Sequence, residues 1–281
     1  MVTSSRRRYK VSRPRHRSRR RKSAFPFREA VLWILGAAVA VVMIAITCHH
    51  RADQRSHDGQ GDYSAGDYEV HGIDVSHHQG KVDWGKVSRA TLHGKSIRFA
   101  FAKCTEGRTR QDANYDFNRI ATRHHGLLFG AYHYFVPGRS AEDQATNFIK
   151  HAHLHKGDLP PVLDVERSGH LSPAELSHQV KRWLKLVGDH YDCIPIVYTY
   201  HDFMQKRLVR DSLKDYPFWK ALYLDDGRIR GNDWAFCQYT RHGHVAGIRD
   251  GVNDYVDLNV FAGTPEDLKA LTLGAGVPPS H

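Results

Sequence analysis

Four carboxylates occur inside or at the ends of otherwise apolar segments, where an ionised group is costly to bury without a purpose. Asp164 and Glu166 stand two residues apart in the segment LPPVLDVE, so on a strand both side chains point to the same side. Asp74 lies in GIDVS and Asp257 in YVDLN. One carboxylate of such a pair raises the pKa of the other, which can then protonate a leaving oxygen, as glycoside hydrolysis requires. For any single acid the alternative is an exposed strand end or a structural ion pair.

The strands that would position these acids are predicted by eight short runs rich in apolar and β-branched residues. Most of the runs are almost continuously apolar, which is typical of strands covered on both faces, as in a parallel sheet flanked by helices. The runs are residues 72–76, 97–104, 127–135, 160–166, 194–200, 218–224, 234–240 and 255–261.

Helix signals follow the early runs. Ser172 precedes a proline and Glu175, the pattern of a capped helix start, and similar starts occur at Ser140 and Thr264. After residue 214 the gaps between runs are short and show little helical periodicity. The pattern predicts an α/β fold, an irregular TIM-like (β/α) barrel with a reduced helix complement. The alternative, an open doubly wound sheet, lacks the Gly-rich phosphate turn of nucleotide-binding proteins.

The charge of the chain is concentrated at its N-terminus. The formal net charge is +11, but residues 1–28 contain 12 of the 41 Lys and Arg and none of the 30 Asp and Glu. Residues 30–48 form an uncharged apolar stretch long enough to span a bilayer. We therefore expect a basic cytoplasmic tail (1–29), one transmembrane helix (30–48) and a flexible linker (49–70). The protein would then cross the membrane once and carry its folded domain on the periplasmic or extracellular side.

Other interpretations of the N-terminus are a cleaved signal peptide, a lipoprotein signal ending at Cys48, and a nucleic-acid-binding arm. The adjoining apolar span already accounts for the basic charges, so we expect no nucleic acid partner.

Metal and redox sites have little support in the sequence. The four cysteines include no C-x-x-C pair, and whether one disulfide forms among Cys104, Cys193 and Cys237 stays open. His151, His153 and His155 alternate, but they fall at the end of a predicted helix, where alternate side chains diverge. We expect neither a metal nor a cofactor.

Seven segments follow one another along the chain: HGIDVSHHQGKVDW (71–84), FAKCTEG (101–107), GAYHYF (130–135), LPPVLDVE (159–166), IPIVYT (194–199), FCQYT (236–240) and VDLNVF (256–261). In this order they resemble the signature blocks of glycoside hydrolase family 25, the lysozymes that act as N-acetylmuramidases. The resemblance covers nearly all of residues 71–263. It implies an irregular (β/α) barrel over residues 71–265. The helix start at Thr264 predicts a short C-terminal helix and tail after it (266–281). The resemblance further implies hydrolysis of the β-1,4 bond between N-acetylmuramic acid and N-acetylglucosamine.

The resemblance also assigns roles to the four acids. Glu166 matches the general acid/base and Asp164 its partner carboxylate, while Asp74 and Asp257 match the other two active-site aspartates of the family. The spacing does not decide whether an aspartate attacks the sugar or the N-acetyl oxygen of the substrate does so. We favour the substrate-assisted route for Asp164.

Further positions match the family's substrate groove. Tyr132, Tyr198 and Gln238 are expected to line it, although each could equally be a core residue. Cys237 stands where the family usually has tryptophan, which removes an aromatic side chain expected near the groove. Lys103 and Glu106 match the family as a supporting ion pair.

We thus expect a monomeric, membrane-anchored muramidase whose partner is peptidoglycan. Two other classes of function remain open at this point. One is a catalytically silent peptidoglycan-binding module, against which the four intact acids argue. The other is a scaffold whose basic tail recruits anionic lipid or nucleic acid.

Overall fold

The computed structural model describes residues 63–223, 228–231, 233–248 and 254–275. The predicted tail (1–29) and membrane span (30–48) lie outside the described residues, as does most of the predicted linker. Among the described residues, no helix combines the length and the apolar character needed to cross a membrane.

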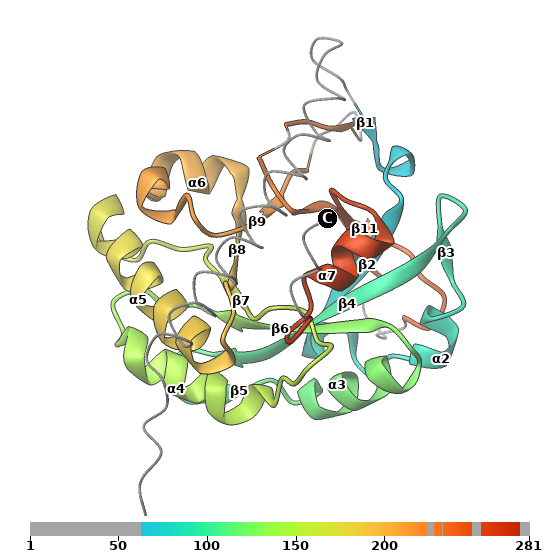
Figure 1. Ribbon diagram of the computed structural model, residues 1–281, viewed down its shortest axis with the longest axis horizontal. Coiled ribbons are helices and arrows are strands. Elements are labelled where there is room, and N and C mark those ends of the chain that lie inside the picture. Colours follow the sequence, from blue (N-terminus) through green and yellow to red (C-terminus); the bar gives the residue numbers. More distant parts are fainter. Residues whose placement is uncertain (1–62, 224–227, 232, 249–253, 276–281) are drawn as a thin grey trace, which may run out of the picture.

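The described chain forms a closed barrel of eight strands with helices around part of its outside (Figure 1). Each strand pairs with the next one along the chain, and the last pairs with the first. The barrel strands are β2 (Val70–Val75), β4 (Lys95–Glu106), β6 (Leu128–Tyr134), β7 (Val162–Asp164), β8 (Ile196–Tyr200), β9 (Phe218–Ala221), β11 (Phe236–Gly243) and β12 (Val256–Phe261). All eight predicted runs coincide with these strands.

The predicted parallel sheet is wrong for the last strand. The pairs from β2 through β11 are parallel, but β12 runs antiparallel to both β11 and β2 and closes the barrel between them. A parallel neighbour needs a long crossover, usually a helix, to carry the chain back. The short segment between Gly243 and Val256 reverses the chain instead.

Helices cover the outside of the first part of the barrel. They are α2 (Trp84–Val87), α3 (Tyr115–His124), α4 (Ala141–Ala152), α5 (Pro173–Tyr191) and α6 (His201–Arg207). After the last strand comes α7 (Pro265–Ala270), and the single 3-10 turns are η1 (Ala65–Asp67), η2 (His77–Gln79) and η3 (Arg210–Leu213). The three predicted helix starts are confirmed: the side chains of Ser140, Ser172 and Thr264 each accept a backbone hydrogen bond at the start of α4, α5 and α7. In the described residues between β9 and β12 there is no helix.

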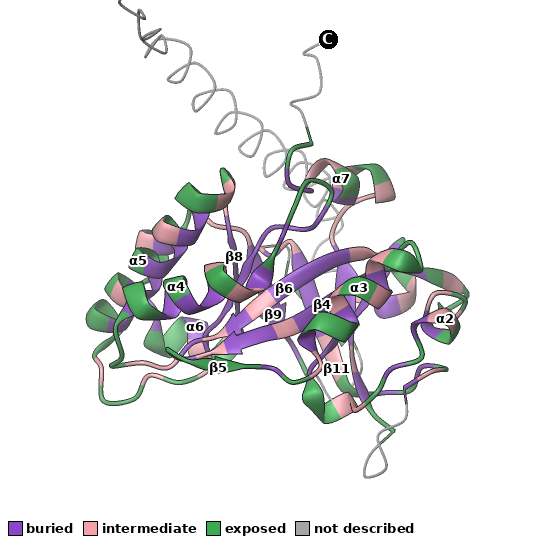
Figure 2. Cartoon of the chain, turned by 90° about the horizontal axis from the view of Figure 1, so that it is seen from below, coloured by how far each residue is buried: buried purple, intermediate pink, exposed green. Residues whose placement is uncertain are grey.

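The core has two layers, one inside the barrel and one between the strands and the helices. On β4, Phe99 and Phe101 point inward, while Ala100, Ala102 and Cys104 belong to the outer layer. The aromatic side chains fill the end of the barrel where the parallel strands begin, and α7 lies across that end with Leu268 packed against them. Figure 2 shows the buried strands enclosed by helices whose outward faces are exposed. The opposite end of the barrel, where the parallel strands finish, is left for polar groups.

The folded part begins earlier than predicted. The sequence predicts residues 63–70 as part of the linker, yet β1 (Tyr63–Ser64) pairs with β10 (Arg228–Ile229), and Tyr68 is buried. The ammonium of Lys95 donates to the carbonyl oxygens of Gly66 and Tyr68 at 2.6 and 2.7 Å. Tyr68 belongs to the outer core layer and packs against Trp234, which precedes β11, on a side where the described residues form no helix. The remaining short strands are β3 (Thr91–Leu92) and β5 (Arg110–Gln111).

Candidate active site

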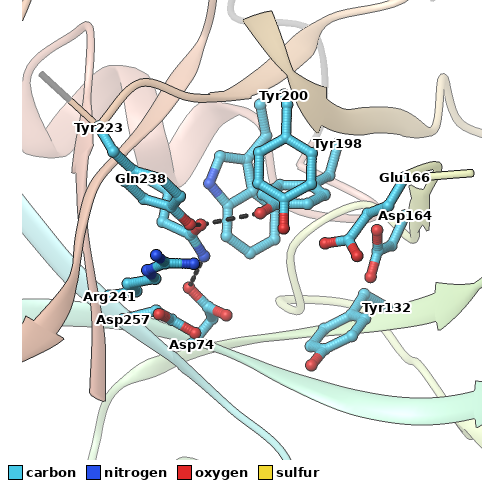
Figure 3. A pocket seen from close by; sticks show the side chains of 11 residues that line it. Asp74, Tyr132, Asp164, Glu166, Tyr198, Tyr200, Tyr223, Gln238, Arg241 and Asp257 are labelled. Atoms are coloured by element: carbon cyan, nitrogen blue, oxygen red, sulfur yellow. Dashed lines mark hydrogen bonds between the residues drawn. The ribbon is translucent and has the colours of Figure 1, made fainter. Parts of the chain in front are cut away.

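A pocket of about 190 Å³ opens at the carboxyl ends of the parallel strands (Figure 3). All seven side chains that the sequence assigned to the site line it. They are Asp74 on β2, Tyr132 on β6, Asp164 and Glu166 at the end of β7, Tyr198 on β8, Gln238 on β11 and Asp257 on β12. Residues far apart in the chain therefore meet at one end of the barrel.

Asp164 is the last residue of β7, and Glu166 follows just beyond the strand. Burial, followed by the charge of Glu166, raises the pKa of Asp164 well above its ordinary value. One carboxylate oxygen of Asp164, Oδ1, is buried without a hydrogen-bond partner among the described residues. Burial also raises the pKa of Glu166, although a hydrogen bond from Tyr200 and the charge of Arg167 oppose this rise. Glu166 is thus a carboxyl that holds a proton more readily than one in water.

Asp74 and Asp257 form a second carboxyl pair. They stand directly opposite each other where β2 and β12 pair, so their side chains lie on the same face of the sheet. Burial and the neighbouring Asp74 raise the pKa of Asp257 to about 9, and the two carboxyls share a hydrogen bond. Burial raises the pKa of Asp74 to about 6. At neutral pH Asp257 is therefore the protonated member, which donates to an ionised Asp74.

Asp74 is held in place by two amide side chains. The amides of Gln238 and Asn259 donate to its Oδ2 at 2.8 and 2.7 Å. Asn259 in turn accepts from the indole N–H of Trp219 at 2.8 Å, and Gln238 accepts from the hydroxyl of Tyr198 at 2.8 Å. These buried, mutually satisfied bonds fix both the position and the ionised form of Asp74.

Some site residues were missed by the sequence analysis. Tyr200, Trp219, Tyr223 and Arg241 line the pocket, and Asn259 lies beneath it. A signal existed for two of them: Tyr200 stands two residues after Tyr198, and Asn259 two residues after Asp257, so each shares a face with a predicted site residue. Trp219, Tyr223 and Arg241 carry no such signal.

The expectation for Cys237 is corrected by the structure. Its side chain is buried in the outer core layer, on the opposite side of β11 from Gln238, because neighbouring residues of a strand alternate between faces. The exchange of tryptophan for cysteine therefore changes packing behind the barrel wall rather than the pocket. Cys104, Cys193 and Cys237 are all free thiols.

The remaining sequence interpretations fall outside the pocket. Lys103 and Glu106 do form the supporting pair, with 2.7 Å between Nζ and Oε2. His151 lies on α4, which ends at Ala152, and its Nδ1 hydrogen-bonds to the carbonyl of Asn147 at 2.8 Å. In the described part of the chain, no group of His, Cys, Asp or Glu side chains is arranged to hold a metal ion.

Comparisons with known proteins agree with this geometry. The sequence profile of glycosyl hydrolases family 25 matches residues 73–248. The chain is 41% identical over 210 residues to the uncharacterized protein YegX of Escherichia coli K12, which covers 74% of this chain and 75% of YegX. It is 30% identical over 217 residues to lysozyme M1 of Streptomyces globisporus, which covers 72% of this chain and 71% of that lysozyme.

Solved structures show the same architecture. The bacterial lysozyme of Streptomyces coelicolor superimposes with a TM-score of 0.65 at 27% identity, covering 74% of this chain and 98% of that one. A family 25 glycosyl hydrolase of Bacillus anthracis gives 0.64 at 27% identity, covering 76% and 99%. The profile match spans most of the barrel, and the strands that it includes carry the pocket acids at the ends of β2 and β7. The chain is a member of glycosyl hydrolases family 25.

Proposed function

We propose that the protein is a lysozyme-type peptidoglycan hydrolase that cleaves the β-1,4 bond between N-acetylmuramic acid and N-acetylglucosamine. Its membership of family 25 and its similarity to lysozyme M1 support the class of reaction. The observation that carries the proposal is the pocket itself. Four carboxyl groups line one pocket at the mouth of the barrel. Their surroundings give them different pKa values, so that at neutral pH Asp257 holds a proton while Asp74 is ionised.

Glu166 is proposed as the general acid and base. Its raised pKa keeps the proton available, and the hydrogen bond from Tyr200 orients the carboxyl group. In the first step Glu166 gives this proton to the glycosidic oxygen, which leaves as the C4 hydroxyl of N-acetylglucosamine. In the second step the Glu166 carboxylate removes a proton from the attacking water and regains its starting form.

Asp164 is proposed to orient the 2-acetamido group of the muramic acid unit. Its unpartnered Oδ1 is buried at the pocket, where a substrate N–H would relieve the cost of leaving a polar atom unsatisfied. With the N–H held there, the acetamido oxygen forms a bond to the anomeric carbon as the bond to the glycosidic oxygen breaks. Water then attacks the same carbon and opens the oxazolinium ring, so the anomeric configuration is retained.

Asp74 and Asp257 are proposed to act on the sugar from the other wall. The ionised Asp74 places a fixed negative charge near the positive charge that develops on the sugar ring in the transition state. Asp257 holds its proton and can donate a hydrogen bond to a sugar hydroxyl or to Asp74. The wall thus combines one fixed charge with one proton donor.

The proposal also includes the setting of the enzyme. The basic residues 1–29 and the apolar stretch 30–48 support an N-terminal anchor with the barrel outside the cytoplasmic membrane, where the wall substrate lies. Proteolysis of intact spheroplasts tests this: cleavage of the barrel from outside is expected, and full protection would overturn the anchored orientation.

Hydrolysis is tested with the full chain as wild type, Glu166→Gln and, as a matched control, Glu266→Gln, which changes an exposed glutamate on α7. Release of new reducing ends from purified peptidoglycan and co-sedimentation with it are measured together. Wild type and Glu266→Gln should bind and cleave, whereas Glu166→Gln should bind and lose about 100-fold or more in rate. Binding without cleavage by all three proteins would instead identify a silent peptidoglycan-binding module.

A further inference from the structure

One cation stands among the carboxylates and tyrosines that line the described pocket. The side chain of Arg241 reaches into it from β11, on the same wall as Asp74 and Asp257 (Figure 3). Asp164 and Glu166 lie on the opposite wall. The proposed reaction gives Arg241 no role, and a guanidinium group in a substrate pocket is a strong hydrogen-bond donor to anions.

An irregularity in β11 aims Arg241 into the pocket. In a regular strand, residues three apart point to opposite faces, yet Gln238 and Arg241 both line the pocket. The pairing of β11 with β12 shifts register between Gln238 and Thr240 and again between Thr240 and Gly243. Such bulges next to active sites redirect side chains. The orientation of Arg241 is therefore built into the backbone.

Tyr223 holds the guanidinium in place. The Arg241 head group lies 5.6 Å from the centre of the Tyr223 ring, a cation–π contact. The Tyr223 hydroxyl donates to Gln238, which is itself bonded to Asp74. Through Tyr223 and Gln238, Arg241 is thus connected to the hydrogen-bond network around the ionised Asp74. Within the part of the chain that the structure describes, it forms no hydrogen bond or ion pair with Asp74 or Asp257 itself.

Among the residues that the structure describes, the guanidinium of Arg241 donates no hydrogen bond to a protein group, so its donors face the pocket. Within the described residues no carboxylate forms an ion pair with Arg241, and its charge reaches Asp257 only through space. At neutral pH the protonated Asp257 carries no charge to neutralise it. An arginine has five N–H donors in a planar fork that matches a carboxylate. Arg241 therefore presents an unused carboxylate-binding face to the pocket.

The geometry of the proposed reaction indicates which anion would reach this face. Glu166 acts at C1 of the muramic acid unit and Asp164 at its C2 acetamido group, both on one wall. The substituent on C3 is next to C2 on the ring and leaves it along the pocket, away from the Asp164 wall, and Arg241 is the cation among the described lining residues that this substituent can meet. In muramic acid this substituent is a lactyl ether, which ends in a carboxylate or continues into a stem peptide that bears carboxylates. N-acetylglucosamine has only a hydroxyl group at C3.

We propose that Arg241, stacked on Tyr223, forms an anion-binding subsite that takes a carboxylate of the C3 substituent of muramic acid and so selects muramyl units over plain N-acetylglucosamine. The inference rests on the proposed function, because that reaction sets the orientation of the sugar. A muramyl unit would then be held from both walls at once, by Asp164 and Glu166 on one side and by Arg241 on the other.

The test uses the full chain and three glycan preparations: strands stripped of peptide, the same strands with the lactyl carboxylates reduced to alcohols, and strands that retain stem peptides. Binding is measured in a Glu166→Gln background and cleavage in the active protein, each with Arg241, Arg241→Gln and Arg241→Lys. Arg182→Gln, which removes an exposed cation on α5, is the matched control.

Arg241→Gln should weaken binding to carboxylate-bearing strands by about 10- to 100-fold, the range of a hydrogen bond to a charged group. It should leave binding to carboxyl-reduced strands unchanged, and Arg241→Lys should retain part of the preference. An effect on stripped strands identifies the lactyl carboxylate as the ligand, and an effect confined to peptide-bearing strands identifies the stem.

Equal losses on carboxylate-bearing and reduced strands would overturn the subsite, since Arg241 would then act only on the pocket acids. Binding that depends on Arg241 and on the carboxylate, without cleavage by any protein, would uphold the subsite and overturn the proposed hydrolysis. Cleavage that does not depend on the carboxylate would uphold the proposed hydrolysis and overturn the subsite.

Discussion

Replacing Asp257 with asparagine should remove a pH dependence of stability that the wild-type protein carries. Burial and the neighbouring Asp74 raise the pKa of Asp257 from 3.8 to about 9. Between these values the native state holds a proton that the unfolded chain has released. The stabilisation from this group is therefore complete below the lower pKa and is lost as pH rises through the upper one.

The size of the effect follows from the proton that is retained. One retained proton lowers the free energy of unfolding by up to ~1.4 kcal/mol per pH unit within that window. The asparagine amide can donate to Asp74 as the protonated carboxyl does, but it has no proton to lose at these pH values. Because the Asp257 side chain is only partly buried, we expect the stability of the variant relative to wild type to rise by roughly 1 kcal/mol per pH unit.

Urea unfolding of the full chain, followed by tryptophan fluorescence at pH 5, 6, 7 and 8, measures this difference. Asp189→Asn is the control, because Asp189 is an exposed carboxylate that pairs with Lys185 on α5. Its stability should run parallel to that of wild type across the series. If the stability of Asp257→Asn relative to wild type stays constant or decreases as pH rises, the shared proton of the aspartate pair is refuted.

Two further substitutions probe the groups behind the pocket. Asn259→Leu removes a donor to Asp74 and leaves the indole N–H of Trp219 unpaired. The pKa of Asp74 should rise by about 1 unit or more, the worth of a charge-assisted hydrogen bond, so the acid limb of the rate profile should move to higher pH. A fall in rate with an unmoved acid limb would contradict this role. Asp233→Asn leaves the ammonium of Lys220, whose side chain is 1% exposed, without its charge partner. Urea unfolding should show a loss of about 3 kcal/mol that Lys220→Met largely restores in the double variant, whereas a loss under about 1 kcal/mol would mean that the pair is effectively solvated.

The strands and the four pocket acids could be predicted because their signals are local. A strand buried on both faces is mostly apolar where it is covered, which marks the middle of β4 and of β6. A carboxylate within such a run is costly, so Asp74 and Asp257 stand out. The i, i+2 spacing of Asp164 and Glu166 also survives in the structure as two carboxyls at one end of the pocket.

The features that could not be predicted depend on pairings between distant segments. Nothing within VDLNVF indicates that β12 runs antiparallel, because direction is set by the connection that precedes the strand. Arg241 reaches the pocket only through the register shift in β11, which arises from the pairing with β12. Tyr68 was placed in the linker because its flanking residues are polar, yet it packs against Trp234 with 5.5 Å between ring centres. Cys237 is a different case: with Gln238 assigned to the groove, the alternation of strand residues already indicates that Cys237 faces the other way.

The most direct test of the central claim is the identity of the new reducing end. Peptidoglycan digested with the full-length protein is reduced with borohydride, hydrolysed, and analysed for amino sugar alcohols by mass spectrometry. The account predicts muramitol as the product that increases with digestion, and no increase when Glu166 is replaced by glutamine. Accumulation of glucosaminitol instead would show that the enzyme cuts the other glycosidic bond and would contradict the assignment of the muramic acid unit to the wall formed by Asp164 and Glu166.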